Sequence, residues 1–360
     1  MIAFLVIAGA LWALGAAMKA PRNARWLMIA LLYVVVLMIE VGLPEGSAPR
    51  ELFGGSPAPW IITGVLVALV LAYREALRRV RLRVRPVEPA TAAPGPGVLR
   101  EVEVERYARH IVLREIGGPG QRRLKEASVL VVGAGGLGAP ALLYLAGAGV
   151  GRLGVIDHDM VDATNLQRQV IHRDADQGSP KALSAARAIT ALNPYVEVRP
   201  YVRRFEEAIA TELVAEYDLV LDGTDEWTTR ALVNRTAVAL GVPLISGAIA
   251  QWEGQVSLFD PARGTPCHAC VFPKEPEPGV APSCAEGGVL GPLPGIVGSL
   301  MAAEAVKWAT GAGETLAGRL MILDALGAEA RTIRIAPRAD CAVCGGRGAR
   351  LPAGTKLAAP

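Results

Sequence analysis

Three apolar segments open the chain, and a mixed pattern of apolar runs, glycine-rich turns and polar stretches follows them. The apolar segments cover about residues 1–18, 26–43 and 57–73. A helix of about eighteen residues is roughly 27 Å long, close to the hydrocarbon thickness of a bilayer. We therefore predict a transmembrane anchor of about three helices over residues 1–80. The alternatives are a cleaved signal peptide ending near residue 20, and two spans followed by an interfacial helix.

Cations set the expected orientation of this anchor. The first loop carries Lys19, Arg22 and Arg25, and residues 74–85 read REALRRVRLRVR, whereas residues 44–59 hold one arginine and two glutamates. By the positive-inside rule, the first loop and everything after the third segment lie in the cytoplasm. The expected location is therefore the inner cell membrane, as a multi-pass protein.

The rest of the chain divides into a linker, a domain and a tail. Residues 81–100 are basic and rich in proline, and VRPVEPATAAPGPG within them shows no hydrophobic periodicity, which predicts a linker. Residues 101–346 have the pattern of one α/β domain, and residues 347–360 are expected to be a disordered tail.

The α/β pattern is clearest at the start of the domain. Apolar runs at Ser128–Val132 and Leu153–Ile156 predict two buried strands, and the small-residue stretch Leu137–Ala148 between them predicts a helix. A third parallel strand is expected in YDLVLDGTDEWTTR, and a later helix at Ser299–Trp308.

Composition and charge narrow the function classes. Hydrophobic residues make up 52% of the chain and charged residues 20%, and the apolar excess lies in the first eighty or so residues. The net charge is only +3, which argues against a nucleic-acid-binding surface. No G-x-x-x-x-G-K-[ST] motif occurs, which excludes a P-loop ATPase.

A glycine-rich turn is the first candidate for chemistry. It reads GAGGLG between the first predicted strand and helix, and such a turn lets backbone N–H groups approach a phosphate. Asp157 ends the next strand, where a carboxylate can bond a ribose hydroxyl. NAD, FAD, S-adenosylmethionine and ATP all use such a turn, and a purely structural turn is a further alternative. The glycines are Gly133, Gly135, Gly136 and Gly138.

Charged residues after this turn favour ATP. A dinucleotide already held by glycine amides does not need further cations. A triphosphate does, because cations neutralise the extra negative charge as pyrophosphate leaves. Asp222 and Asp225 follow the third predicted strand, where a carboxylate near phosphates is a natural Mg²⁺ ligand. The bland alternative is that each cation is a solvated surface charge. The polar residues of this stretch are Asn165, Arg168, Gln169 and Lys181.

Four of the five cysteines form two C-x-x-C pairs, TPCHAC and ADCAVC, about seventy residues apart. Such pairs predict a structural Cys₄ zinc site formed by Cys267, Cys270, Cys341 and Cys344, with two separate redox pairs as the alternative. The fifth cysteine, Cys284, lies in the loop PSCAEGGVLGPL, and the sequence leaves open whether its thiol is inert or reactive.

Together these motifs resemble the MoeB/ThiF group of adenylyltransferases, which belongs to the ubiquitin-activating-enzyme-like superfamily. The resemblance covers about residues 103–346 and rests on motifs in the family's order: RYARHIVL, GAGGLG, NLQRQ, GSPK, GTDEWTTR, PSCAEGGVLGPL and the two C-x-x-C pairs. It implies a Rossmann-like, mainly parallel sheet with antiparallel C-terminal strands and a Cys₄ zinc site. The transmembrane front end is not a usual part of this family.

The resemblance also implies a reaction and roles for residues. The C-terminal carboxylate of a ubiquitin-like sulfur-carrier protein, of molybdopterin or thiamine type, attacks the α-phosphate of ATP with Mg²⁺ bound. A separate protein is expected to donate sulfur. Asp157 holds the ribose, with Asp159 nearby. Asn165, Arg168 and Lys181 hold the phosphates, Gln169 also contributes to the cofactor site, and Asp225 organises Mg²⁺. Arg109 reaches the site of a second copy in a homodimer, and Cys284 matches a position that in some members takes the activated group and in others is dispensable.

Three alternatives remain open from the residues. One is carboxylate activation for protein conjugation or peptide modification through a Cys284 thioester, and another is an NAD-linked oxidoreductase on the same glycine turn. The third is a scaffold or sensor with a degenerate site. Its one point of support is that Glu226 stands where the family usually has asparagine, which adds a negative charge beside Asp225.

Overall fold

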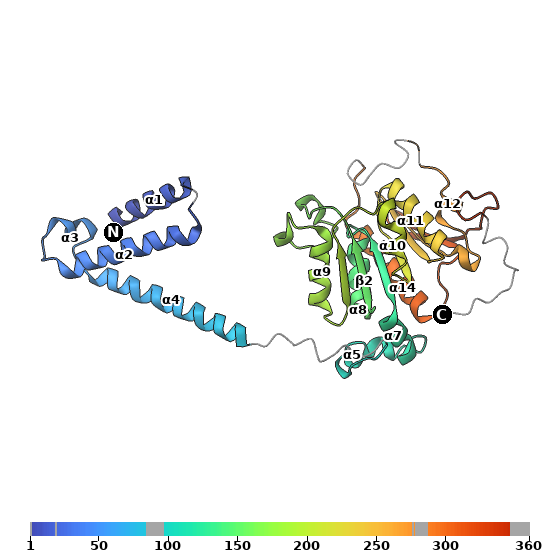
Figure 1. Cartoon of the computed structure of the whole chain (residues 1–360), viewed down its shortest axis with the longest axis horizontal. Coiled ribbons are helices and arrows are strands. Elements are labelled where there is room, and N and C mark those ends of the chain that lie inside the picture. Colours follow the sequence, from blue (N-terminus) through green and yellow to red (C-terminus); the bar gives the residue numbers. More distant parts are fainter. Residues whose placement is uncertain (1, 19, 84–96, 276, 278–286, 346–360) are drawn as a thin grey trace. The chain divides into compact units, whose positions relative to one another are not determined.

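The computed structural model describes residues 2–18, 20–83, 97–275, 277 and 287–345. The chain falls into two units, Met1–Ala92 and Ala93–Pro360, and each has its own apolar interior (Figure 1). The predicted tail, most of the predicted linker and Cys284 lie outside the described residues.

The N-terminal unit consists of helices. Its interior is formed by the buried side chains of Val36, Phe53 and Trp60, and the ring of Phe4 packs edge-on against Trp60. The Trp60 indole N–H donates to the carbonyl oxygen of Phe53 at 3.2 Å, which fixes the loop between two of the helices. The helices are α1 (Ile2–Ala17), α2 (Arg22–Gly42), α3 (Ala48–Phe53) and α4 (Ala58–Arg83).

Two of these helices, not three, have the length and composition of a membrane span. The qualifying stretches are Ala24–Gly42 and Ala58–Ala76, of which only 11% and 6% of the residues are buried inside the unit. Helix α1 has 16 residues and is therefore about 24 Å long, short of the roughly 30 Å of a hydrocarbon core. The prediction of three spans is corrected to two candidate spans, and the three-span topology at the inner membrane is not supported.

A buried ion pair holds the far end of α2. Glu40 is fully buried, and its carboxylate lies 3.6 Å from the guanidinium of Arg50 on α3. Arg50 also donates to the carbonyl oxygen of Leu43 at 3.1 Å. An unpaired buried charge would be costly, so this pair ties the short helix α3 to the end of α2.

The second unit is built on one eight-stranded sheet of order β3-β2-β1-β4-β5-β6-β7-β8. The first five strands along the chain pair in parallel, and the last three pair antiparallel, which confirms the predicted mixed Rossmann-like sheet. The strands are β1 (Ser128–Val132), β2 (Arg152–Ile156), β3 (Glu197–Tyr201), β4 (Leu219–Asp222), β5 (Leu244–Ala250), β6 (Glu253–Phe259), β7 (Arg319–Asp324) and β8 (Glu329–Arg334).

Apolar side chains cover both faces of the sheet because the central strands are buried on both sides. In β1, Val129 and Val131 face one helical layer, and Leu130 and Val132 face the other. Helices α8 (Gly138–Ala148), α9 (Lys181–Leu192) and α14 (Pro292–Thr310) pack on the first face, and α10 (Glu207–Val214) and α11 (Trp227–Leu240) on the second. Three shorter helices precede β1: α5 (Glu101–Arg106), α6 (Ala108–Ile111) and α7 (Gly117–Glu126).

The strand order predicts where a ligand binds. The chain runs outward from β1 to β2 and β3, then returns to place β4 on the other side of β1. In open α/β sheets, ligands bind outside the carboxyl ends of the strands at such a reversal. The glycine-rich turn lies at the carboxyl end of β1 and therefore at this point.

Candidate active site

The glycine turn has a backbone that only glycine fits at two positions. Gly133 has φ of +92°, a conformation that side chains disfavour. A Cβ on Gly138, at the first residue of α8, would lie 1.8 Å from the carbonyl oxygen of Gly133. Gly138 thus serves the close approach of helix and turn, whereas Gly135 and Gly136 line the cavity described below.

Asp157, after β2, holds the turn in place. Its carboxylate accepts from the backbone N–H groups of Ala134 and Asp159, each at 2.8 Å. Burial raises the pKa of Asp157 above its usual value, against the lowering effect of those hydrogen bonds. The contact to a ribose that the sequence predicts for Asp157, with Asp159 nearby, remains a prediction.

Lys181, the first residue of α9, is nearly fully buried and forms an ion pair with Asp159 at 2.8 Å. Burial alone would raise the pKa of Asp159, but the hydrogen bond and charge of Lys181 outweigh it, and the pKa lies below the usual value. Pro180 precedes Lys181 in an extended conformation, so the helix begins at the lysine itself. The ammonium group is therefore held at the cavity wall by the start of a rigid helix.

The NLQRQ motif forms a tight turn beside the glycines. Asp162 caps a short 3₁₀ helix, Ala163–Asn165, by accepting from the backbone N–H of Thr164 at 2.9 Å. Arg168 donates to the carbonyl oxygen of Thr164 at 3.1 Å, and the Gln169 amide donates to Asn165 at 2.8 Å. These bonds within the motif orient its polar side chains, which line the cavity.

The two acids after β4 have different surroundings. Asp222 is fully buried and accepts from the backbone N–H of Thr224 at 3.0 Å and from its hydroxyl at 2.7 Å. Asp225 is exposed and lies on the cavity wall. Asp222 thus shapes the loop, and Asp225 presents a carboxylate, the oxygen donor that Mg²⁺ prefers.

These elements enclose one cavity of about 1450 Å³, larger than the roughly 300–1,000 Å³ of pockets that take drug-sized ligands. Beyond the glycine turn it extends along β5 and β6 to α12 (His268–Val271). The predicted site residues that it collects are Gly133, Gly135, Gly136, Asp157, Asp159, Asn165, Arg168, Gln169, Lys181 and Asp225.

Two described residues predicted for the nucleotide site, Gly138 and Arg109, do not line this cavity, and several unpredicted residues do. Gly138 packs behind the turn, Arg109 is exposed on α6, and Cys284 lies outside the described residues. The lining residues that sequence reasoning missed come from segments far apart in the chain. Trp227 and Arg230 lie within GTDEWTTR and His268 within TPCHAC, but Arg204 and Phe272 lie outside every motif.

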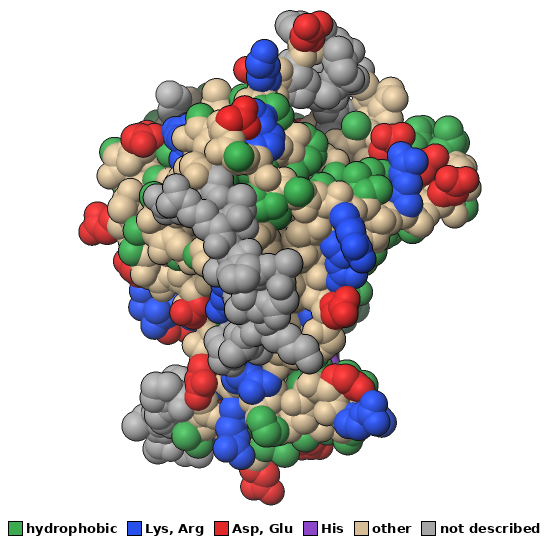
Figure 2. Space-filling model, turned by 90° about the vertical axis from the view of Figure 1, so that its right-hand side faces the viewer, with side chains coloured by type: hydrophobic (Ala, Val, Ile, Leu, Met, Phe, Trp, Pro, Cys, Tyr) green, Lys and Arg blue, Asp and Glu red, His purple; other side chains and the backbone are tan. Residues whose placement is uncertain are grey.

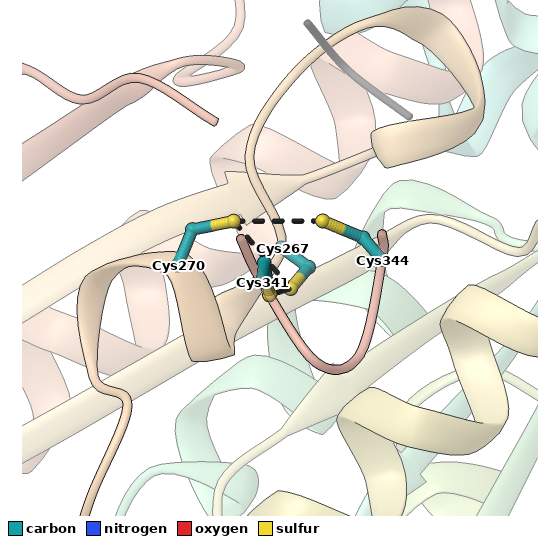
Figure 3. Close-up of side chains that lie close together, drawn as sticks. All are labelled: Cys267, Cys270, Cys341 and Cys344. Carbon is teal, nitrogen blue, oxygen red and sulfur yellow. Dashed lines mark hydrogen bonds between the residues drawn. The ribbon is translucent and has the colours of Figure 1, made fainter. Parts of the chain in front are cut away.

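The four paired cysteines meet in one buried cluster (Figure 3). The sulfur of Cys267 lies 3.8 Å from that of Cys270 and 3.6 Å from that of Cys341, and Cys270 lies 3.5 Å from Cys344. Around a tetrahedral zinc ion with Zn–S distances of about 2.3 Å, neighbouring sulfurs are about 3.8 Å apart. The spacing of these four donors therefore fits zinc.

One thiol of the cluster is prepared for ionisation. Burial opposes ionisation, but the backbone N–H groups of Cys344 and Val343 bond the Cys341 sulfur, and the pKa of Cys341 falls to about 7. A thiolate is the form that binds zinc. The cluster packs against Val238 of α11, the helix that follows the Asp225 loop.

Comparisons with known proteins decide the family. Residues 107–343 match the sequence profile of the family described as "ThiF family". This chain belongs to the ThiF family. The predicted MoeB/ThiF resemblance is thereby confirmed, and the matched residues cover most of the second unit.

Two relatives each match about two thirds of this ThiF-family chain. One is the "Sulfur carrier protein adenylyltransferase" of Thermus thermophilus, 51% identical over 247 residues that make up 68% of this chain and 91% of that protein. The other is the "Probable adenylyltransferase/sulfurtransferase MoeZ" of Mycobacterium tuberculosis, 52% identical over 252 residues. That match covers 69% of this chain and 63% of MoeZ, so the chain spans less than two thirds of MoeZ.

A solved structure supports the fold. The crystal structure of E. coli MccB with ATP has a TM-score of 0.59 at 23% sequence identity and covers 70% of this chain and 76% of its own. At that identity the likeness shows the fold alone.

The surface charge agrees with the low net charge of the chain. On the face drawn in Figure 2, Lys and Arg side chains are interspersed with Asp and Glu side chains.

Proposed function

We propose that this chain is an ATP- and Mg²⁺-dependent adenylyltransferase that activates the C-terminal carboxylate of a ubiquitin-like sulfur-carrier protein and releases pyrophosphate. The observation that carries the proposal is the single cavity in which the glycine turn, Arg168, Lys181 and Asp225 face one another. The 51% identity to a sulfur carrier protein adenylyltransferase supports the substrate class. Neither the cavity lining nor the names of the two relatives favour the oxidoreductase alternative.

The reaction needs positioning and charge neutralisation. A carboxylate oxygen of the carrier attacks the α-phosphorus of ATP, the bond from that phosphorus to the α–β bridging oxygen breaks, and a carrier acyl-adenylate and pyrophosphate result. Arg168 and Lys181 offset the charge that moves onto pyrophosphate, and the turn holds the reacting groups in line. Asp225 would hold Mg²⁺, which supplies further charge neutralisation. No protein nucleophile is required for this step.

The part of the cavity beyond the nucleotide suits a narrow peptide tail. Its wall includes Ala248 and Ala250 of β5 and Gly254 of β6, whose side chains have one carbon or none. Such a wall leaves room for an extended Gly-Gly terminus to lie close to the strand backbones. We propose that the carrier's C-terminus reaches the α-phosphate along this part of the cavity.

ATP–pyrophosphate exchange by the full chain in detergent tests this function. With Mg²⁺ and a cognate carrier, we expect label from pyrophosphate to enter ATP. A carrier that lacks its last two residues is the matched control and should support no exchange, because the attacking carboxylate no longer reaches the α-phosphate. Equal exchange with both carriers would contradict the proposed substrate.

Further parts of the proposal rest on the family resemblance. The chain acts as a homodimer in which Arg109 of one copy enters the site of the other, which agrees with the exposed position of Arg109 outside the cavity. The four-cysteine cluster holds structural zinc. Cys284 accepts the activated group after adenylylation or is dispensable, and a separate protein donates sulfur. If Cys284→Ala keeps exchange but loses transfer, Cys284 accepts the activated group. If the variant keeps both activities, Cys284 is dispensable.

We also propose that α2 and α4 anchor the chain in a membrane. Their span-length stretches are largely exposed within the unit, unlike the core helices of a soluble domain. On fractionation of cells, we expect the full chain in the membrane fraction, resistant to extraction with alkaline carbonate. A chain that begins at residue 97 should be found in the soluble fraction. Extraction of the full chain by carbonate would contradict an integral anchor.

A further inference from the structure

Glu226 presents an electrostatic problem for the proposed site. It follows Asp225 directly, and both side chains line the cavity. A carboxylate beside the residue proposed to face Mg²⁺ would repel a triphosphate, because like charges a few ångströms apart repel more strongly near a protein surface than in bulk water. The structure contains an arrangement that offsets this charge.

The carboxylate of Glu226 is held by Arg204. One guanidinium nitrogen of Arg204 donates to both oxygens of Glu226, at 2.9 and 3.2 Å. The hydroxyl of Thr229 donates to the same carboxylate at 3.0 Å. The negative charge of Glu226 is therefore paired and oriented at the start of α11.

Arg204 reaches Glu226 across the cavity mouth. Arg204 follows β3 and Glu226 follows β4, and in the sheet β2 and β1 lie between these two strands. The next residue, Phe205, is buried in the core against β1 and β2 and fixes the segment. The other terminal nitrogen of Arg204 lies 2.9 Å from Nε2 of His158, at the end of β2. The contact thus joins both flanks of the nucleotide site.

We propose that Arg204 is a positioning residue that keeps the charge of Glu226 away from the nucleotide phosphates and thereby preserves affinity for Mg·ATP. The inference rests on the proposed function, since it assumes that the cavity binds a triphosphate. With its charge offset by Arg204, Glu226 is compatible with a functional nucleotide site and gives no support to the scaffold alternative. Because both side chains are about half exposed, the effect depends on ionic strength.

Binding of Mg·AMPCPP, an ATP analogue with a methylene bridge between the α- and β-phosphates, measures this effect in the full chain in detergent. We expect Arg204→Ala to raise the Kd about tenfold at low salt, which corresponds to about 1.4 kcal/mol, and the defect to shrink at high salt. Glu226→Gln should bind at least as tightly as the wild type. The double variant Arg204→Ala/Glu226→Gln should regain wild-type affinity within about twofold.

The matched control is Arg235→Ala, which breaks a similar exposed pair with Glu207 away from the cavity and should leave the Kd unchanged. Three results would overturn the inference: an unaltered Kd in Arg204→Ala, a defect that the double variant keeps, since Arg204 would then bind phosphate itself, or an equal defect in Arg235→Ala. Absence of binding by the wild type would instead overturn the proposed function. Melting temperatures verify that each variant is folded.

Discussion

Lys181→Ala is expected to lower ATP–pyrophosphate exchange about 10²- to 10³-fold, the usual cost of removing one preorganised charge from a transition state. The fold fixes the position of Lys181, because it is buried at the first turn of α9 and bonded to Asp159 at 2.8 Å. The remaining Asp159 carboxylate is half exposed, so the variant should stay folded. Initial exchange rates at saturating carrier measure the effect.

A cation on the same helix provides the control. Arg187 is exposed, pairs with Asp176 at 2.7 Å and does not line the cavity, so Arg187→Ala should retain exchange within about twofold. Equal losses in both variants would contradict a specific role for Lys181, because any loss of positive charge on α9 would then have the same effect.

The proposed homodimer allows a further test. A mixed dimer of coexpressed Arg109→Ala and Lys181→Ala chains contains one complete site and should regain part of the lost activity.

Cys341→Ser is expected to abolish zinc binding and lower the melting temperature by about 10 °C or more. A structural zinc site contributes several kcal/mol to folding, and about 1 kcal/mol corresponds to 2–4 °C for a domain of this size. The loss should loosen the last described residues and α11, against which the cluster packs. Zinc content by elemental analysis and thermal unfolding in detergent measure both effects.

Cys284→Ser is the control for this prediction, because Cys284 is the one cysteine outside the C-x-x-C pairs. It should leave the zinc content and the melting temperature as in the wild type. One bound zinc per chain in Cys341→Ser, or no zinc in the purified wild type, would contradict a structural Cys₄ zinc site.

Much of the second unit follows from local patterns in the sequence. The apolar run Ser128–Val132 forms β1 with the predicted bounds, and the cysteine pairs meet as their spacing predicts. Each pattern points to a simple arrangement: a short apolar run is buried in a parallel sheet, and two C-x-x-C pairs can share one metal. The helix predicted at Ser299–Trp308 begins earlier, at Pro292, because proline is tolerated in the first turn of a helix.

Other features depend on contacts that no local pattern marks. The Arg204–Glu226 pair joins the ends of two strands that are not neighbours in the sheet, so it becomes visible only with the strand order. Helix α1 lies close to the predicted residues 1–18, but its 16 residues are too few for a span. The role proposed for Arg109, which is exposed on α6, involves a second copy of the chain, and Cys284 lies outside the described residues.

The mass of the carrier protein after incubation with the full chain and Mg·ATP tests the central claim most directly. If ATP is split between its first two phosphorus atoms, the carrier gains one AMP at its C-terminus and pyrophosphate appears in equal amount. With Lys181→Ala the adduct should form about 10²- to 10³-fold more slowly. Formation of ADP and orthophosphate would contradict the account. An unmodified carrier, together with binding of NAD and not of ATP by the wild-type chain, would contradict it as well.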